Sequence, residues 1–164
     1  KMLVGVVSDT HNNIKNIKKI ISLFEAEQVD LVIHTGDISK ATTLEIFSNL
    51  NCPLVGVFGN NDRIEEGLKE VCQEYNFNFK EPPLPLTLGN KKVVVFHEPE
   101  LIEEYINDHQ DIDIILHGHT HRYKEETTDG IIFFNPGESA GSMEGKSAIG
   151  LIDMCNLEIK RIFF

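Results

Sequence analysis

The sequence predicts an α/β protein in which two packed β-sheets carry helices on their outer faces. Three observations support this fold class. Short apolar runs alternate with amphipathic helical patterns in the first half of the chain, whereas apolar runs follow one another closely in the second half. The length of 164 residues is near the usual size of one compact domain. We therefore expect a single domain over residues 1–164.

Five short runs of β-branched and apolar residues, each ending in polar residues or glycine, predict buried strands. They are LVGVV (3–7), LVIH (31–34), PLVGVFG (53–59), KVVVFH (92–97) and IDIILHG (112–118). Three apolar stripes at helical spacing lie between or after the early runs: Ile14, Ile17, Ile20, Ile21 and Phe24; Leu44 and Phe47; Ile64, Leu68, Val71, Cys72 and Tyr75. Strands that alternate with helices predict parallel pairing with right-handed crossovers.

The alternation fades after the segment EPPLPLTLGNKK. Three apolar runs with turn residues between them follow at short intervals: GIIFFNPG (130–137), SAIGLID (147–153) and LEIKRIFF (157–164). Short connections of this kind favour hairpins, so this half is expected to be mainly antiparallel.

Composition and charge exclude several classes of function. With 41% hydrophobic and 25% charged residues the chain is globular in type, and no apolar run approaches the roughly 20 residues that span a bilayer. We expect no membrane association and, because the apolar start MLVGVVSD is too short for a signal peptide, a cytoplasmic location. The net charge of −11 argues against non-specific nucleic-acid binding. The three widely spaced cysteines form no CxxC pair, so neither a disulfide framework nor a thiolate zinc site is indicated.

Polar side chains that can bind metal ions follow directly after the predicted strands. They are Asp9, His11, Asp37, Asn60, His97, His119 and His121. In α/β sheets the carboxyl ends of strands line the ligand-binding crevice, so these seven side chains are expected to converge there. Oxygen and imidazole ligands suit Mn²⁺, Fe, Zn²⁺ or Ni²⁺. Seven ligands are too many for one tetrahedral zinc ion, but they suit two ions that share a bridging carboxylate.

The order of these motifs resembles that of the calcineurin-like metallophosphoesterase superfamily. The series is Asp-x-His, Gly-Asp, Gly-Asn-x-Asp, His and Gly-His-x-His, and with the NPG segment that comes after it the resemblance covers residues 9–137. The length and the NPG segment are similar to the short single-domain phosphodiesterase branch. The resemblance implies a four-layer αββα fold of two facing mixed β-sheets flanked by helices, with a dinuclear site at one edge.

The resemblance also implies roles for individual residues. Asp9, His11 and His121 would hold one metal, Asn60, His97 and His119 would hold the other, and Asp37 would bridge. The expected cofactors are two divalent ions, Mn²⁺ or Ni²⁺ first, with Fe or Zn²⁺ as alternatives. A hydroxide that spans the two metals would attack the phosphorus of a small phosphodiester substrate. The residues expected to act in catalysis are Asp37, Asn60, Asn61 and His97. The sequence leaves open whether the protein forms a homo-oligomer.

Three further histidines have simpler interpretations. His117 points to the opposite face of its strand from its neighbours, which favours a core histidine with satisfied hydrogen bonds. His34 is either a buried structural residue or one that orients a metal ligand. His109, in the segment NDHQD, is expected at a solvated helix end.

The sequence departs from the family pattern at several positions. Many members carry His at the position of Asn61, and an amide cannot protonate a leaving group. Asp62 would then be a helix cap, with Glu65 completing a capping box. Glu98 is expected to add negative charge at the mouth of the site, and Glu138 stands where the branch commonly has Ser. Asn135 and Gly137 are expected to be turn residues, with a role in shaping the site edge as the alternative.

Three competing interpretations differ in class. The retromer subunit with this fold has a degraded metal site and works through its surfaces, so a protein-binding scaffold is the main alternative. A dinucleotide-binding fold is disfavoured because GVVSDTHNN lacks the GxGxxG pattern. A TIM-barrel hydrolase is disfavoured because that fold typically needs about 250 residues.

Overall fold

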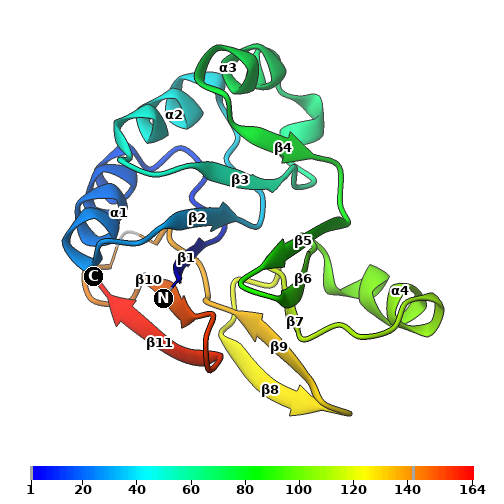
Figure 1. The fold of residues 1–164 in the computed structure, drawn as a ribbon. Helices are drawn as coiled ribbons and strands as arrows, with labels where there is room; N and C mark the ends of the chain where they lie inside the picture. Colours follow the sequence, from blue (N-terminus) through cyan, green and yellow to red (C-terminus); the bar gives the residue numbers. More distant parts are fainter. Residues whose placement is uncertain (1, 142) are drawn as a thin grey trace.

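A six-stranded mixed sheet forms one half of the protein, in the order β11-β10-β1-β2-β3-β4 (Figure 1). The computed structural model describes residues 2–141 and 143–164. Strands β1 to β4 run parallel, and β10 and β11 extend the sheet in antiparallel fashion. The bounds are β1 (Leu3–Val7), β2 (Leu31–His34), β3 (Leu54–Val57), β4 (Asn78–Lys80), β10 (Ala148–Asp153) and β11 (Glu158–Phe163).

A five-stranded sheet in the order β5-β6-β7-β9-β8 faces the first (Figure 1). Its bounds are β5 (Leu84–Leu88), β6 (Lys91–Val95), β7 (Ile114–Leu116), β8 (Lys124–Thr128) and β9 (Ile131–Asn135). The two edge strands are antiparallel to their neighbours, but β6, β7 and β9 are parallel. The expectation of a mainly antiparallel second half is confirmed for β10 and β11 and for the pair β8 and β9, but it is wrong for the pairing of β9 with β7, which is parallel. A helix connects β6 to β7 and an edge strand lies between β7 and β9 in the chain, so both connections can cross over.

Helices cover the outer face of each sheet and complete four layers. The first sheet carries α1 (Ile14–Glu27), α2 (Ala41–Ile46), η1 (Phe47–Asn49) and α3 (Leu68–Tyr75), and the second carries η3 (Pro99–Leu101) and α4 (Ile102–Asp108). A short helix, η2 (Asp62–Ile64), follows β3. The predicted αββα arrangement of two facing mixed sheets is confirmed.

The helices form where the apolar stripes predicted them, with one exception. Helix α1 begins after Asn13, whose side chain accepts a hydrogen bond from the backbone N–H of Asn16, as a capping residue does. The third stripe was expected to begin at Ile64, but Ile64 lies in η2 and is 83% exposed. Gly67, with φ of +87°, separates it from α3. The turn at Gly67 thus removes Ile64 from the apolar face.

Three apolar clusters hold the layers together. The central cluster lies between the sheets, and Val6, Ile33 and Val57 of the first sheet pack there with Val95 and Leu116 of the second. The outer clusters join each sheet to its helices. Among the described residues, no helix is long and apolar enough to cross a membrane.

Candidate metal centre

The seven predicted ligands lie together at one edge of the two sheets. Asp9 and His11 follow β1, Asp37 follows β2, and Asn60 follows β3. His97 follows β6, while His119 and His121 follow β7. The carboxyl ends of these parallel strands meet at this edge, so the loops after them bring the side chains together.

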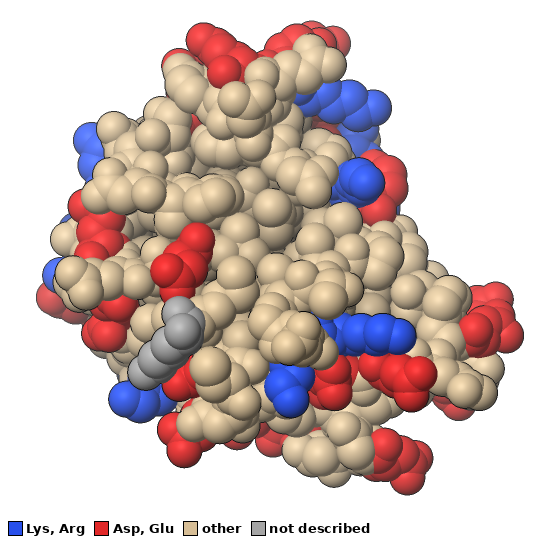
Figure 2. Space-filling view, in the orientation of Figure 1, with Lys and Arg blue, Asp and Glu red and all other residues tan. Residues whose placement is uncertain are grey.

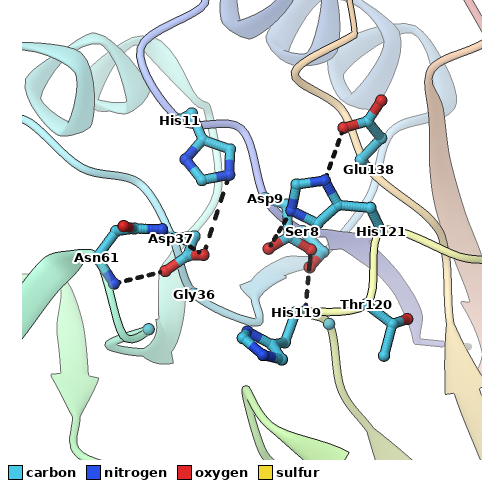
Figure 3. A network of polar contacts seen from close by, with 12 residues as sticks. Ser8, Asp9, His11, Gly36, Asp37, Asn61, His119, Thr120, His121 and Glu138 are labelled. Carbon is cyan, nitrogen blue, oxygen red and sulfur yellow. Dashed lines mark hydrogen bonds and ion pairs between the residues drawn. The ribbon is translucent and has the colours of Figure 1, made fainter.

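Ligand atoms of four residues form a first group, made of Asp9, His11, Asp37 and His121 (Figure 3). Each offers one atom, and these atoms all lie within 4.8 Å of one another. Nε2 of His121 lies 3.6 Å from Oδ1 of Asp9, and Nε2 of His11 lies 3.9 Å from Oδ2 of Asp37. Two carboxylates and two imidazoles thus face a common space.

A second group contains Asp37, His97 and His119, whose ligand atoms also lie within 4.8 Å of one another. The Asn60 side chain joins this group, because its Oδ1 lies 2.9 Å from Nε2 of His97 and 3.1 Å from Nδ1 of His119. Nε2 of His97 is 3.3 Å from Oδ2 of Asp37. Asp37 is the residue that the two groups share.

The chemistry of these side chains fits divalent metal ions. The Oδ1 atom of Asp9 is buried and has no hydrogen-bond partner among the described residues, although Oδ2 accepts from the Ser8 hydroxyl at 2.5 Å and from the His119 amide at 3.1 Å. A buried carboxylate oxygen without a partner is costly. An ion bound at Oδ1 would satisfy it, and nitrogen and oxygen ligands are those that Mn²⁺, Fe, Zn²⁺ and Ni²⁺ accept.

Several ligands adopt an unusual backbone conformation. The φ angles of Asp9, His11, Asp37, His119 and His121 lie between 47° and 68°, in the left-handed region. This region costs a non-glycine residue roughly 1 kcal/mol or more, and such residues cluster at functional sites. The surrounding contacts must hold these loops in place.

The glycines of the motifs allow the loops to approach one another. A Cβ atom on Gly118 would overlap the hydroxyl of Ser8, and a Cβ on Gly59 would overlap the carboxylate of Asp37. Glycine at these two positions therefore lets the loop after β7 pack on the loop after β1, and the loop after β3 pack on the loop after β2.

Burial and neighbouring groups shift the pKa values of the buried ligands. Burial acts to raise the pKa of Asp37, but hydrogen bonds and charge from His97, together with hydrogen bonds from Asn61, outweigh it and hold this pKa below its usual range. Burial acts to lower the pKa of His97, and the contact with Asp37 raises it overall. The pKa of Asp9 is raised, mainly by burial.

His34 forms hydrogen bonds with two loops that carry predicted metal ligands. It is fully buried, its Nδ1 accepts from the Gly36 amide at 3.0 Å, and its Nε2 lies 2.9 Å from the Thr10 hydroxyl. Burial lowers the pKa of His34 to about 3, so the ring is neutral. Of the two interpretations of His34, the structure favours orientation of the ligand loops, because Gly36 precedes Asp37 and Thr10 lies between Asp9 and His11.

Asp62 is not a helix cap, which corrects the capping-box interpretation. It is buried inside η2, and its carboxylate accepts backbone N–H groups of Gly59 (2.8 Å), Asp37 (2.8 Å), Ile38 (2.9 Å) and Ser39 (2.6 Å). A capping pattern in the sequence could not reveal this role, since three of the four donors lie in a loop more than 20 residues away.

Asn135 connects the loop after β7 with the turn after β9. It is buried, its Nδ2 donates to the Gly118 carbonyl and to the Thr120 hydroxyl at 3.2 Å, and its Oδ1 accepts from the Gly137 amide at 2.9 Å. The alternative interpretation, a role in shaping the site edge, therefore applies to Asn135 in addition to the turn.

The remaining predictions about single residues have mixed outcomes. His117 is buried, but neither ring nitrogen has a hydrogen-bond partner in the described part of the chain, so a satisfied core histidine is the wrong description. His109 is exposed at the end of α4, as predicted, and stacks on Tyr105. Glu98 is paired at 3.2 Å with Arg63, which also pairs with Glu81, so the charge of Glu98 at the mouth of the site is only partly offset.

Comparison with known proteins identifies the family. A model of the calcineurin-like phosphoesterase superfamily domain matches residues 2–157. The chain belongs to this superfamily. A superfamily relative named phosphodiesterase MJ0936, from Methanocaldococcus jannaschii, is 32% identical over 167 residues that cover 98% of each chain.

Two solved structures share the fold of this chain. A structure described as a novel archaeal phosphodiesterase superposes with a TM-score of 0.88 at 31% identity, covering 99% of this chain and 100% of that one. Vps29 from Entamoeba histolytica, solved with Zn²⁺, gives a TM-score of 0.68 at 19% identity, covering 99% and 98%. At that identity the second likeness shows the fold alone.

Proposed function

We propose that this protein hydrolyses small phosphodiesters with two divalent metal ions, held by the seven residues of the candidate metal centre. Asp9, His11 and His121 would hold one ion, and Asn60, His97 and His119 would hold the other. The observation that carries the proposal is Asp37, because its carboxylate belongs to both groups of ligand atoms and can bridge. Membership of the superfamily and the 32% identity to a relative named a phosphodiesterase support this enzyme class.

The protein contributes orientation and a fixed arrangement of donors. When bound, such a pair of ions supplies an activated water molecule and stabilises the charge that develops on the phosphate. His97 donates its Nδ1–H to the Thr35 carbonyl at 2.8 Å, which leaves Nε2 free to face the site. Mn²⁺ or Ni²⁺ are our proposed ions, with Fe or Zn²⁺ as alternatives.

Arg63, the basic side chain paired with Glu98 beside the site, is shared with a second acid, which favours a diester over a more highly charged monoester. Its guanidinium lies 3.2 Å from a carboxylate oxygen of Glu81 and 3.2 Å from one of Glu98, the residue after His97. On the face shown in Figure 2, Lys and Arg side chains stand in small separate groups among Asp and Glu. A long polyanion such as a nucleic acid would find no continuous basic track on this face.

Both sheets contribute to one core and to one site, which supports a single catalytic domain over residues 1–164. The central apolar cluster contains residues of both sheets. Asp37 comes from the first sheet and His97 from the second, and their side chains are 3.3 Å apart. Separating the sheets would therefore dismantle the site.

A protein-binding scaffold is the second candidate, and the similarity of fold to Vps29 favours it. The ligand set argues for the enzyme, because all seven side chains converge and Asp9 keeps a buried oxygen without a partner in the described structure. A scaffold would bind a partner through its surface and would lose little when the metal ligands are replaced.

The experiment that tests the proposal combines metal content with hydrolysis. Purified protein loaded with Mn²⁺ should contain two ions per chain and hydrolyse bis(p-nitrophenyl) phosphate. Asp37→Asn should lose at least about 100-fold in turnover, since the metal ions contribute several kcal/mol to the transition state. Asp108→Asn, at an exposed position on α4, is the matched control and should keep full activity. Full hydrolysis by Asp37→Asn, or a single ion bound away from Asp37, would refute the proposal.

A further inference from the structure

His121 is held from behind by a carboxylate that comes from a distant part of the chain. Its Nδ1 lies 2.9 Å from Oε2 of Glu138, and its Nε2 lies 3.6 Å from Oδ1 of Asp9 (Figure 3). The imidazole therefore stands between two carboxylates, one outside the site and one within it. An ionised carboxylate can only accept a hydrogen bond, so the 2.9 Å contact with Glu138 favours a proton on Nδ1, whereas the 3.6 Å separation from Asp9 is too long for a hydrogen bond and leaves the Nε2 lone pair available to a metal ion.

The other histidines of the centre have different supports. His97 is oriented by a backbone carbonyl, that of Thr35. His119 turns its Nδ1 toward the site, where it lies 3.1 Å from Asn60. His11 has its Nδ1 3.4 Å from the Ser39 hydroxyl. In the contacts described for these rings, His121 is the one that a charged side chain orients from outside the site.

The position of Glu138 is defined by its neighbours in the segment 135–139. Asn135 joins this segment to the loop that carries His119 and His121, through the Gly118 carbonyl and the Thr120 hydroxyl. Ser139 is buried, and its amide donates to the Ser8 carbonyl at 3.1 Å, next to Asp9. The segment is thus tied to two of the three loops that supply the first group of ligands, those after β7 and β1. Glu138 lies in the chain between Asn135 and Ser139, which form these hydrogen bonds, and its carboxylate contacts His121.

We propose that Glu138 is a positioning residue that orients His121 and strengthens metal binding by the first group. This inference rests on the proposed function, since it assumes that the first group binds an ion. Outer carboxylates of this kind fix the tautomer of a ligating histidine and raise its basicity, and their loss typically costs 10- to 100-fold in metal affinity. The side chains of His121 and Glu138 are 41% and 36% exposed. Solvent screens such a pair, so we expect a loss of about 10-fold, at the lower end of that range.

The contact between Glu138 and His121 also makes the two groups of ligands differ in their expected affinity for a metal ion. The first group contains the carboxylates of Asp9 and Asp37 and is backed by Glu138, whereas the second contains the Asp37 carboxylate with neutral donors. A divalent ion should therefore fill the first position at lower concentration. Replacing Glu138 should weaken metal binding at the first position and so reduce the difference in metal affinity between the two positions.

The test is a calorimetric titration of metal-free protein with Mn²⁺, for the wild type and three variants. Glu138→Ala should weaken the tighter of two binding events by about 10-fold and leave the weaker event within about twofold. Glu138→Gln keeps an acceptor for Nδ1–H and should show a smaller loss. Glu98→Gln is the matched control, because it removes one carboxylate at the rim whose described partner is Arg63 and not a ligand. It should leave both affinities unchanged.

A second measurement reads the orientation of His121 directly and needs no metal. Long-range ¹H–¹⁵N spectra of the metal-free wild type, recorded at a pH at which the His121 ring carries one proton, should show that proton on Nδ1. Glu138→Ala should shift His121 toward the Nε2–H form that free imidazoles favour, while Glu138→Gln should keep the Nδ1–H form. Thermal unfolding of the metal-free variants shows whether Glu138→Ala remains folded. If it does not remain folded, the Mn²⁺ affinities of Glu138→Gln and Glu98→Gln are compared instead. A loss of affinity in Glu138→Gln alone supports the inference, and equal affinities overturn it.

Two results would overturn the inference. One is an unchanged His121 tautomer and unchanged Mn²⁺ affinity in folded Glu138→Ala. The other is an equal loss of affinity in Glu98→Gln, which would show that total charge matters and not the contact. Failure of the proposed function has a different signature: the wild type would then bind no pair of ions and would not hydrolyse bis(p-nitrophenyl) phosphate, whatever the spectra of His121 show.

Discussion

The carboxylate of Asp62 accepts the backbone N–H of Asp37 at 2.8 Å, and so holds the residue that both ligand groups share. The two residues are 25 positions apart and lie in loops after neighbouring strands, β2 and β3. Asp37 itself has a left-handed φ of 63°. The hydrogen bonds to Asp62 offset the cost of that conformation, because they satisfy three consecutive amides of the loop, from Asp37 to Ser39.

Replacing Asp62 should therefore damage stability and metal binding together. Asp62→Ala leaves four buried amides without their acceptor, and each unsatisfied buried donor costs roughly 1–3 kcal/mol. Because the loop can relax toward water, we expect a fall of about 3–5 kcal/mol in the free energy of unfolding, measured by urea denaturation of metal-free protein. Mn²⁺ affinity should fall in parallel.

Glu66→Ala is the control for this change, because Glu66 is exposed in the same loop. It should unfold at the urea concentration of the wild type. Equal stability of Asp62→Ala and Glu66→Ala would contradict the role given to Asp62.

The pH dependence of stability should contain a contribution from His34. Burial lowers the pKa of this ring to about 3 from an ordinary value of 6.5, so the unfolded chain binds the proton more readily. The contribution is fully present above pH 6.5 and is lost as the pH falls from about 6.5 toward 3, with a slope of up to about 1.4 kcal/mol per pH unit. Urea unfolding of metal-free protein between pH 7.5 and 4.5 measures it.

His34→Gln removes this titration and should flatten the stability profile below pH 6.5. At pH 7.5 the variant should be less stable by about 1–3 kcal/mol, since the Gly36 amide loses its acceptor. His109→Gln, at an exposed position, should keep the slope of the wild type. Parallel profiles for the wild type and His34→Gln would rule out this contribution.

His117 should be replaceable by an apolar residue. The ring is buried and neither nitrogen has a partner in the described structure, and burial lowers its pKa to about 4. An unsatisfied buried polar group is a cost, so His117→Leu should leave the free energy of unfolding unchanged or raise it by about 1 kcal/mol, with turnover unchanged. The contrast is His34→Leu, which removes two hydrogen bonds and should destabilise. A folded, metal-loaded His117→Leu without activity would show a catalytic role for His117.

Asn61 should determine how strongly the rate depends on the leaving group. Its amide nitrogen and side chain donate to the two oxygens of Asp37 at 3.0 and 2.9 Å, and it has no proton to give to a departing alkoxide. Aryl phosphodiesters should therefore be hydrolysed well and alkyl phosphodiesters poorly. Asn61→His should flatten the dependence, because a positioned acid is worth about 10² to 10⁴ in rate.

The measurement is a series of diesters with leaving groups of increasing pKa, at saturating Mn²⁺, for both proteins. A shallow dependence in the wild type that Asn61→His does not alter would mean that another residue supplies the proton. Asn61→Ala separates the loss of the contact with Asp37 from the gain of an acid, since it removes the amide without adding an imidazole.

The sequence by itself determined the main strands and helices and the location of the candidate site at the ends of the strands. Alternating strand and helix patterns identify β1, β2, β3, β6 and β7, since burial on both faces demands continuous apolar runs. The polar residues directly after those runs must lie at one edge of the sheets, because parallel strands end together. The candidate ligand set from Asp9 to His121 can therefore be identified from the sequence alone.

Tertiary structure alone decided how these ligands are held. The short edge strand β8 consists entirely of exposed residues and β4 has three residues, so neither carries an apolar pattern of its own. The contacts of Asp62 with Asp37 and of Glu138 with His121 join separate loops, and no periodicity relates their positions. The His119 amide reaches Asp9 across 110 residues. Such pairs depend on where loops meet in space, and a sequence records only which side chains are available to meet there.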